Sequence, residues 1–71
     1  MKLEVGRVYK RIYDGKTTYF KVIGEDDDAG VWYHISIFGG GNIELPATWF
    51  DDYDIRISNK SEVLLNSLDD W

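Results

Sequence analysis

Apolar and polar residues alternate along residues 31–38, and this stretch says more about the fold than any other. Alternation places successive side chains on opposite faces of a strand. One face is almost wholly apolar and comprises Val31, Tyr33, Ile35 and Ile37. The other face is mixed and comprises Trp32, His34, Ser36 and Phe38. We therefore predict a strand that buries its first face and leaves its second half buried or turned toward a ligand.

Two earlier strands are predicted over residues 8–13 and 17–24, on either side of the segment Asp14-Gly15-Lys16. The Asp-Gly pair supplies the positive-φ positions that a tight hairpin favours, so these strands are expected to pair directly. Residues 25–30 are mostly acidic and end in glycine. Such a segment is too charged to pack, and it is predicted to form the next loop.

The second half of the chain continues with short elements. Residues 39–42, Gly-Gly-Gly-Asn, are predicted to form a turn, and a fourth strand follows at residues 43–45. Pro46 lacks an amide donor, so the strand is expected to end there. Residues 47–50 then form a single helical turn.

A fifth strand is predicted over residues 54–58, with Ile55 and Ile57 pointing inward and the polar residues Asp54, Arg56 and Ser58 pointing outward. A helix follows. Asn59 or Ser61 can cap it, and Glu62 stands three residues after Asn59, as in a capping box. Its apolar face is predicted to comprise Leu64, Leu65, Leu68 and Trp71.

These elements describe a mainly β protein: a small five-stranded antiparallel sheet, bent into a partly open barrel, with a short C-terminal α-helix. Closure of this kind removes edges that a flat sheet would expose. We expect residues 1–71 to form one domain, with the barrel over residues 6–58 and the helix over residues 59–71. The short connections predict that the first four strands pair with their neighbours and that the fifth returns to the first.

The order of elements resembles an SH3-like barrel, in which one helical turn separates the fourth and fifth strands. Residues 46–50, Pro-Ala-Thr-Trp-Phe, are similar to the pattern that SH3 domains carry at that turn, and Trp32 stands where those domains place a ligand-contacting tryptophan. The segment Asp14-Gly15-Lys16 is far shorter than the acidic first loop of the peptide-binding subgroup. The resemblance therefore implies a fold and not polyproline recognition.

Composition narrows the functional classes. The 71 residues contain no cysteine, so disulfides and cysteine-based zinc sites are excluded and a reducing, cytoplasmic location is expected. No apolar run approaches a membrane span, and charges near the N-terminus argue against a secretion signal. A net charge of −5 argues against direct binding to nucleic acid and favours a basic protein partner. We expect a monomer.

Aromatic residues are the first candidate for a binding surface, because tyrosine and tryptophan are enriched at binding hot spots. The candidates are Tyr9, Tyr13, Trp32, Trp49 and Tyr53. The alternative is that a chain this short needs these large side chains for its core.

Clustered carboxylates are the second candidate. They comprise Asp26, Asp27 and Asp28, which follow Glu25, and Asp51, Asp52 and Asp54 beside the helical turn. If the two groups converge, their field would attract a basic peptide or imitate the phosphates of DNA. The alternative is a solvated surface that only aids solubility. Calcium is not expected, because the spacing lacks the alternating ligands and central glycine of an EF-hand loop.

Catalysis is not expected. His34, the only histidine, shares a predicted strand face with Ser36, but the sequence carries no nucleophile elbow, phosphate loop or paired-histidine motif, and no cofactor or metal is predicted. The terminal helix offers a further surface, with Leu64, Leu68 and Trp71 either capping the barrel or forming a docking or dimerisation face.

Two functional hypotheses follow. The first is a non-catalytic protein-interaction module that binds a basic partner through an aromatic patch flanked by acidic loops. The alternative is a small acidic inhibitor, encoded by a phage or mobile element, that blocks a nucleic-acid-binding host protein by charge mimicry. Carboxylates in one regular ridge would favour mimicry, whereas scattered carboxylates around an aromatic hollow would favour the interaction module.

Overall fold

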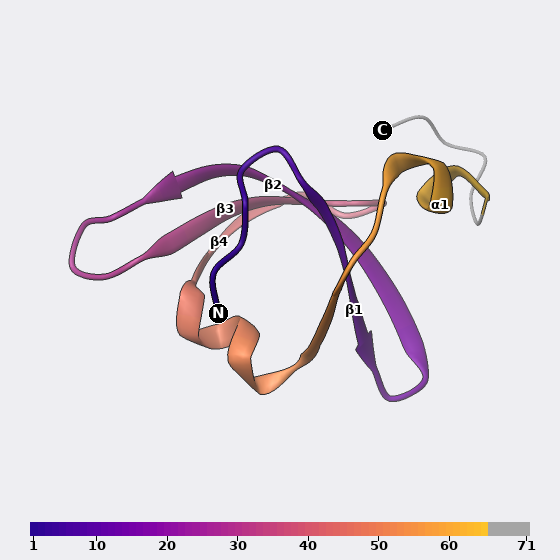
Figure 1. Ribbon diagram of the computed structural model, residues 1–71, viewed down its shortest axis with the longest axis horizontal. Coiled ribbons are helices and arrows are strands. Elements are labelled where there is room, and N and C mark those ends of the chain that lie inside the picture. Colours follow the sequence, from indigo (N-terminus) through magenta and orange to yellow (C-terminus); the bar gives the residue numbers. More distant parts are fainter. Residues whose placement is uncertain (66–71) are drawn as a thin grey trace.

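The computed structural model describes residues 1–65, which form one five-stranded antiparallel sheet with two short helical segments (Figure 1). The strands are β1 (Val8–Tyr13), β2 (Lys16–Asp26), β3 (Trp32–Ile37), β4 (Asn42–Pro46) and β5 (Asp54–Ile57). A 3₁₀ helix, η1 (Ala47–Asp52), connects β4 to β5, and α1 (Lys60–Leu65) follows β5. The strand order is β4-β3-β2-β1-β5. This order confirms that the first four strands pair with their neighbours and that the fifth returns to the first.

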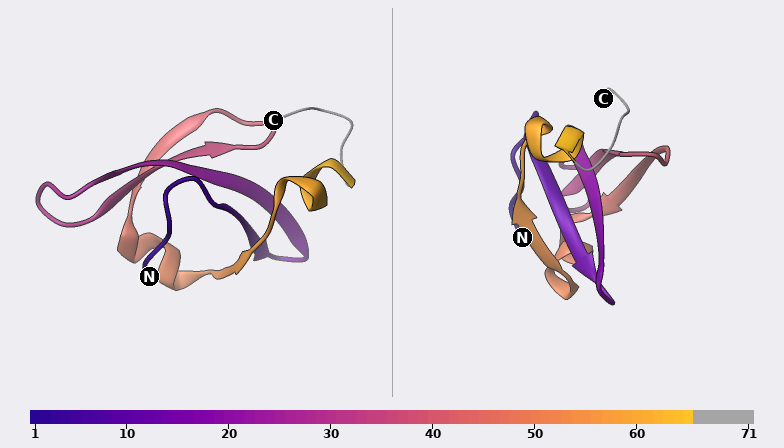
Figure 2. Two further views of the ribbon diagram at one scale, coloured as in Figure 1. Left: turned by 45° about the horizontal axis from the view of Figure 1, so that its top comes forward. Right: turned by 90° about the vertical axis from the view of Figure 1, so that its right-hand side faces the viewer.

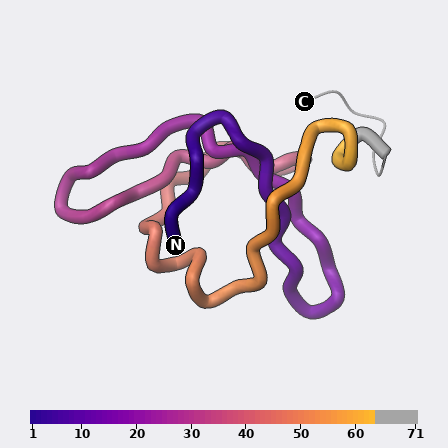
Figure 3. The backbone as a smooth tube through the Cα atoms, in the orientation of Figure 1, coloured from indigo at the N-terminus to yellow at the C-terminus, as the bar shows by residue number. Residues whose placement is uncertain are grey.

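The long strand β2 joins two hairpins that extend in opposite directions (Figures 1 and 3). Its first half pairs with β1, and its second half pairs with β3. The sheet bends along β2, so that η1 and the N-terminal segment lie inside the bend (Figure 2). We call the surface inside the bend the inner face of the sheet and the opposite surface its outer face. β4 and β5 are the two edge strands.

The β1–β2 hairpin has the predicted two-residue turn. Asp14 and Gly15 have φ values of 52° and 74°, which the Asp-Gly pair adopts easily, and Tyr13 pairs directly with Lys16. Lys16 is therefore the first residue of β2 and not a turn residue. No helix of the described residues has the length and apolar character that a bilayer crossing requires.

The predicted loop over residues 25–30 is wrong at its start. Glu25 and Asp26 belong to β2 and pair with Tyr33 and Trp32 on β3. A partner strand was available to satisfy their backbone groups, and this outweighs the low β propensity of acidic residues. The register between β2 and β3 shifts between Val22 and Gly24, where a β-bulge inserts an extra residue.

The core lies between the inner face of the sheet, η1 and the N-terminal segment. Its buried residues are Leu3, Tyr9, Phe20, Val22, Tyr33, Ile35 and Phe50. Phe50 of η1 is fully buried, and its ring contacts those of Phe20 and Tyr33 at centroid distances of 5.7 and 5.9 Å. The Tyr33 hydroxyl accepts a hydrogen bond from the Leu3 amide at 2.9 Å. This bond fixes the N-terminal segment against the core.

The alternation predicted for β3 is confirmed at its centre, where Tyr33 and Ile35 are buried and the residues of the mixed face are only half buried. It is wrong at Val31, which is 36% exposed and precedes the strand, and Ile37 is only partly buried. The alternation predicted for β5 is partly wrong. Ile55 packs against the core, but Ile57 is 64% exposed. β5 is an edge strand, and Ile57 lies farther along it from η1 than Ile55 does, so less of the core covers it.

Ser58 is also buried, contrary to prediction. It lies beside α1, where its hydroxyl donates a hydrogen bond to Glu62 at 3.0 Å and its amide donates to the Val8 carbonyl. Asn59 is the predicted N-cap, because its side chain accepts a hydrogen bond from the Glu62 amide at 2.8 Å.

Val63 of α1 is buried, and it was not singled out from the sequence. The predicted apolar face of this helix lies outside the described part of the structure. It comprises the side chains of Leu64 and Leu65, together with Leu68 and Trp71.

Candidate functional site

Three of the five predicted aromatic residues come together around one arginine. Tyr13 and Tyr53 meet edge to face with ring centroids 5.6 Å apart, and Trp49 lies 4.5 Å from Tyr53. The guanidinium carbon of Arg11 lies over all three rings, 5.2 Å from the Tyr13 centroid, 5.3 Å from Trp49 and 4.4 Å from Tyr53. We call these four residues the aromatic cluster.

Local structure explains the cluster. Arg11 and Tyr13 stand two residues apart on β1, so both side chains point to the inner face of the sheet. Trp49 lies within η1 and Tyr53 ends it, which places both rings beside the inner face at the same end of the sheet. Pro46 precedes η1 with φ −67°, a value to which the proline ring restricts the backbone.

The Arg11 side chain is held by ring faces. Its Nε is buried, and no hydrogen-bond acceptor reaches it among residues 1–65. A buried donor without a partner costs about 1–3 kcal/mol, whereas a cation–π contact contributes about 0.5–2 kcal/mol. The cation–π contacts with the rings thus offset part of this cost.

An apolar groove of about 330 Å³ opens next to the cluster. It is the part of the inner face that η1 does not cover. Its apolar lining comprises Phe20, Ile35, Ile37, Ile43, Leu45 and Trp49, and Arg11 and Thr18 complete it. Ile43 on edge strand β4 is 46% exposed. The groove and the cluster share Arg11 and Trp49, so they form one continuous surface.

Two predicted aromatic site residues lie elsewhere. Tyr9 is only 6% exposed, stacks on Phe20 and accepts a hydrogen bond from the Glu4 amide, so its place in a binding surface is a wrong prediction. It occupies the middle of β1 on the inner face, where the core needs a large side chain. Trp32 is half buried on the outer face of β3, away from the cluster. Sequence alternation cannot tell which inner-face positions an adjoining helix will cover.

The acidic residues divide into separate groups. Asp52 and Asp54 flank Tyr53 in the chain, and the exposed Asp14 follows Tyr13. Asp54 opposes Ile12 in the β1–β5 ladder and therefore points to the outer face, so Asp14 and Asp52 are the two carboxylates next in sequence to the cluster that can face it. Asp14 was not among the predicted site residues. Asp54 accepts two hydrogen bonds from Arg56, and these raise the pKa of the arginine above its ordinary value.

Other carboxylates lie close in space to the first residues of the chain. The Met1 amine pairs with Asp51, and Met1 and Lys2 line a hollow together with Glu25 and Asp27. Asp51 is thus linked through Met1 to the carboxylates of β2 and the β2–β3 loop, whereas Asp14 lies in the β1–β2 turn at the other end of β2 (Figure 1).

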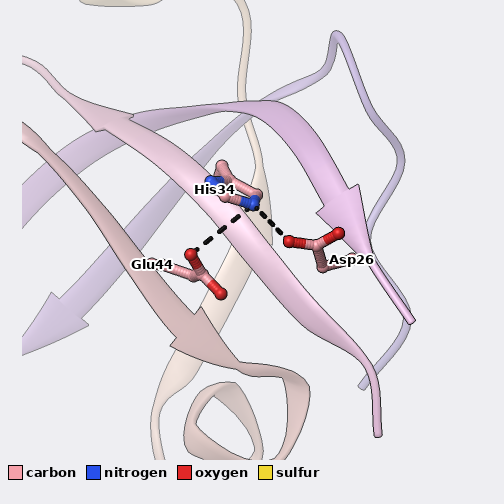
Figure 4. Close-up of side chains that lie close together, drawn as sticks. All are labelled: Asp26, His34 and Glu44. Atoms are coloured by element: carbon pink, nitrogen blue, oxygen red, sulfur yellow. Dashed lines mark hydrogen bonds and ion pairs between the residues drawn. The ribbon is translucent and has the colours of Figure 1, made fainter. Parts of the chain in front are cut away.

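A second group of polar residues was not recognised as a unit in the sequence. Asp26, His34 and Glu44 come from β2, β3 and β4, and their side chains meet on the outer face (Figure 4). His34 Nε2 lies 3.1 Å from Asp26 Oδ2 and 3.6 Å from Glu44 Oε2. His34 directly opposes Glu44 across the ladder, and Ser36 opposes Asn42. His34 thus contacts two carboxylates, whereas the sequence suggested the Ser36 hydroxyl as its neighbour.

Comparison of the chain with protein-family models, with curated proteins and with solved structures finds no match. The SH3-like resemblance therefore stays a prediction.

Proposed function

We propose that this chain is a non-catalytic protein-interaction module that binds a basic segment of a partner protein. One observation carries the proposal: Tyr13, Trp49 and Tyr53 converge on Arg11 at the edge of an apolar groove. Tryptophan, tyrosine and arginine are the residue types most enriched among binding hot spots. We further propose that the module acts in the cytoplasm, because the absence of cysteine suits a reducing compartment. We also propose that it acts as a monomer.

The groove and the cluster supply complementary parts of such a site. Apolar side chains of the partner would fill the groove beside Ile43 and Trp49. Basic side chains of the partner would lie near Asp14 and Asp52, which adjoin Tyr13 and Tyr53 in the chain. This division favours a segment that is both basic and apolar.

Charge mimicry of DNA has less support. Several of the carboxylates that it would use already have intramolecular partners: Asp26 contacts His34, Asp51 contacts the Met1 amine, and Asp54 contacts Arg56. The acidic residues also come from separate parts of the sheet, whereas mimicry requires a regular row of unpaired charges.

Selection of random peptides displayed on phage against the immobilised full chain tests the proposal. We expect enriched peptides that combine Lys or Arg with bulky apolar residues. The Tyr13→Ala variant should bind them about tenfold more weakly or worse, as truncation of a hot-spot residue does. Tyr13 is 52% exposed, so this variant should fold. Trp32→Ala on the outer face is the matched aromatic control and should bind as the wild type does.

Two results would contradict the proposal. One is a selection that enriches no peptide motif on the folded chain. The other is a set of enriched peptides that bind Tyr13→Ala as tightly as the wild-type chain.

A further inference from the structure

The outer face of the sheet carries a candidate metal site that is separate from the aromatic cluster. We propose that Asp26, His34 and Glu44 bind a divalent transition metal, with Zn²⁺ as the expected ion. The three side chains offer one imidazole nitrogen and two carboxylate oxygens, all within 4.8 Å of one another. Nitrogen and oxygen ligands of these types are those that Zn²⁺ takes in proteins.

The distances fit coordination. A tetrahedral Zn²⁺ with bonds of about 2.1 Å keeps its ligand atoms about 3.4 Å apart. His34 Nε2 lies 3.1 Å from Asp26 Oδ2 and 3.6 Å from Glu44 Oε2. Both contacts are therefore close to the required spacing, and small side-chain rotations would bring the third pair of atoms to it. The side chains are 58%, 40% and 46% exposed for Asp26, His34 and Glu44, so water can complete the coordination sphere.

Hydrogen bonding alone accounts for this arrangement less well. Both carboxylates approach the same nitrogen, and a single N–H donates well to only one acceptor. The 3.6 Å separation to Glu44 is too long for a hydrogen bond. Two carboxylates facing one nitrogen also repel each other, whereas a dication between the three groups would bond to all of them.

The backbone positions the three ligands on a rigid scaffold. His34 opposes Gly24 on one side and Glu44 on the other, in a row across three adjacent strands. Gly24 has no side chain, and a Cβ at that position would stand 3.5 Å from the His34 ring, so the imidazole lies against the β2 backbone. Ligands held by neighbouring strands need little reorganisation to bind.

The β-bulge between Val22 and Gly24 brings the third ligand to this face. Val22 is buried on the inner face, so regular alternation would also turn Gly24 and Asp26 inward. The extra residue reverses the alternation, and Asp26 instead pairs with Trp32 and points to the outer face beside His34. The bulge therefore brings Asp26 and His34 onto the same face.

Titration of the untagged full chain with zinc chloride, followed by calorimetry and by NMR of the His34 imidazole nitrogens, tests the site. His34 is the only histidine and there is no cysteine, so a change at its Nε2 reports on this site alone. We expect one equivalent of Zn²⁺ to bind, to shift the Nε2 resonance and to raise the melting temperature. Asp26→Asn and Glu44→Gln should each weaken binding at least tenfold, and His34→Ala should abolish it.

Asp28→Asn and Asp51→Asn are the matched controls. The first removes an exposed carboxylate from the neighbouring loop, and the second removes the partner of the Met1 amine, which is itself a possible metal ligand. Both should bind Zn²⁺ as the wild type does, and circular dichroism verifies that each variant folds. The proposal is overturned if no stoichiometric binding occurs, if His34→Ala keeps its affinity, or if Ca²⁺ competes equally with Zn²⁺.

Discussion

Lys10 Nζ and Glu62 Oε2 lie 2.7 Å apart, although 52 residues separate them in the chain. The same carboxylate accepts hydrogen bonds from the Tyr19 hydroxyl at 3.2 Å and from the Ser58 hydroxyl at 3.0 Å. Lys10 and Tyr19 lie opposite each other on β1 and β2, so one carboxylate joins α1 to two strands. Glu62 thus holds the first turn of the helix against the outer face of the sheet.

These contacts make the stability of the fold depend on pH. The hydrogen bond from Lys10, followed by that from Ser58, lowers the pKa of Glu62 below its ordinary value of 4.5. A carboxylate with a lowered folded-state pKa stabilises the fold above its unfolded pKa, and this contribution is lost as the pH falls through the folded value. We expect Glu62→Gln to be less stable than the wild type at pH 7 and the difference to shrink below pH 4.5.

Denaturant unfolding at a series of pH values from 7 to 3 measures this difference. Glu25→Gln, which removes an exposed carboxylate from the end of β2, is the control and should leave stability nearly unchanged at pH 7. If the difference in unfolding free energy between the wild type and Glu62→Gln stays constant over the whole pH range, the ionised carboxylate of Glu62 does not stabilise the fold.

Ile35→Ala should destabilise the chain by about 2–5 kcal/mol, the usual cost of emptying a buried aliphatic site. Ile35 is 3% exposed on the inner face of β3. Ile57→Ala is the matched control, because this residue is 64% exposed and an exposed substitution usually changes stability by less than about 0.5 kcal/mol. Equal losses for the two variants in denaturant unfolding would contradict the assignment of inner and exposed positions.

Asn59→Ala should cost about 1 kcal/mol, because the side-chain oxygen satisfies the Glu62 amide at the first turn of α1. Ser61→Ala is the control, since Ser61 lies within the helix and does not cap it. Comparison of unfolding midpoints measures both. If the Ser61 variant loses as much stability as the Asn59 variant, the assignment of Asn59 as the N-cap is wrong.

Local signals predicted much of this fold. The Asp14-Gly15 turn, the alternation along β3 and the Asn59 cap each depend on neighbouring residues, and each is confirmed. The strand order followed from short connections that leave few alternatives. The bulge at residue 23 was not predicted, because it depends on how β2 meets β3 and not on a local motif. The bulge brings Asp26 to the outer face.

The candidate sites were less predictable, because they depend on contacts between distant segments. Tyr9 and Tyr13 lie on the same face of β1, but only Tyr13 reaches the surface, since the core covers the middle of the strand. Arg11 matches no binding motif, so the sequence did not identify it as a site residue. Its spacing of two residues from Tyr13 on a predicted strand does place both side chains on the same face. Glu44 was likewise missed, because its proximity to His34 follows from the β3–β4 register.

The charges around the aromatic cluster permit a sharp test of the proposed partner. Of the three carboxylates beside the helical turn, Asp51 and Asp54 already have intramolecular partners. Asp14 and Asp52 are exposed, adjoin Tyr13 and Tyr53 in sequence, and make no ion pair within residues 1–65. The Asp14→Asn, Asp52→Asn double variant therefore removes charge from the site without breaking an ion pair, and asparagine tolerates the φ of 52° at position 14.

We expect this double variant to bind the selected peptide more weakly, mainly through slower association, because charges at the rim of a site steer a partner's approach. Asp27→Asn, Asp28→Asn changes the net charge equally but lies in the β2–β3 loop, so it should have a much smaller effect. Rising salt should slow association of the wild type, since charges are screened beyond about 8 Å at physiological ionic strength. Surface plasmon resonance at several salt concentrations measures all three chains. Equal association rates for the two double variants, or a wild-type rate that does not change with salt, would place the contact away from the aromatic cluster.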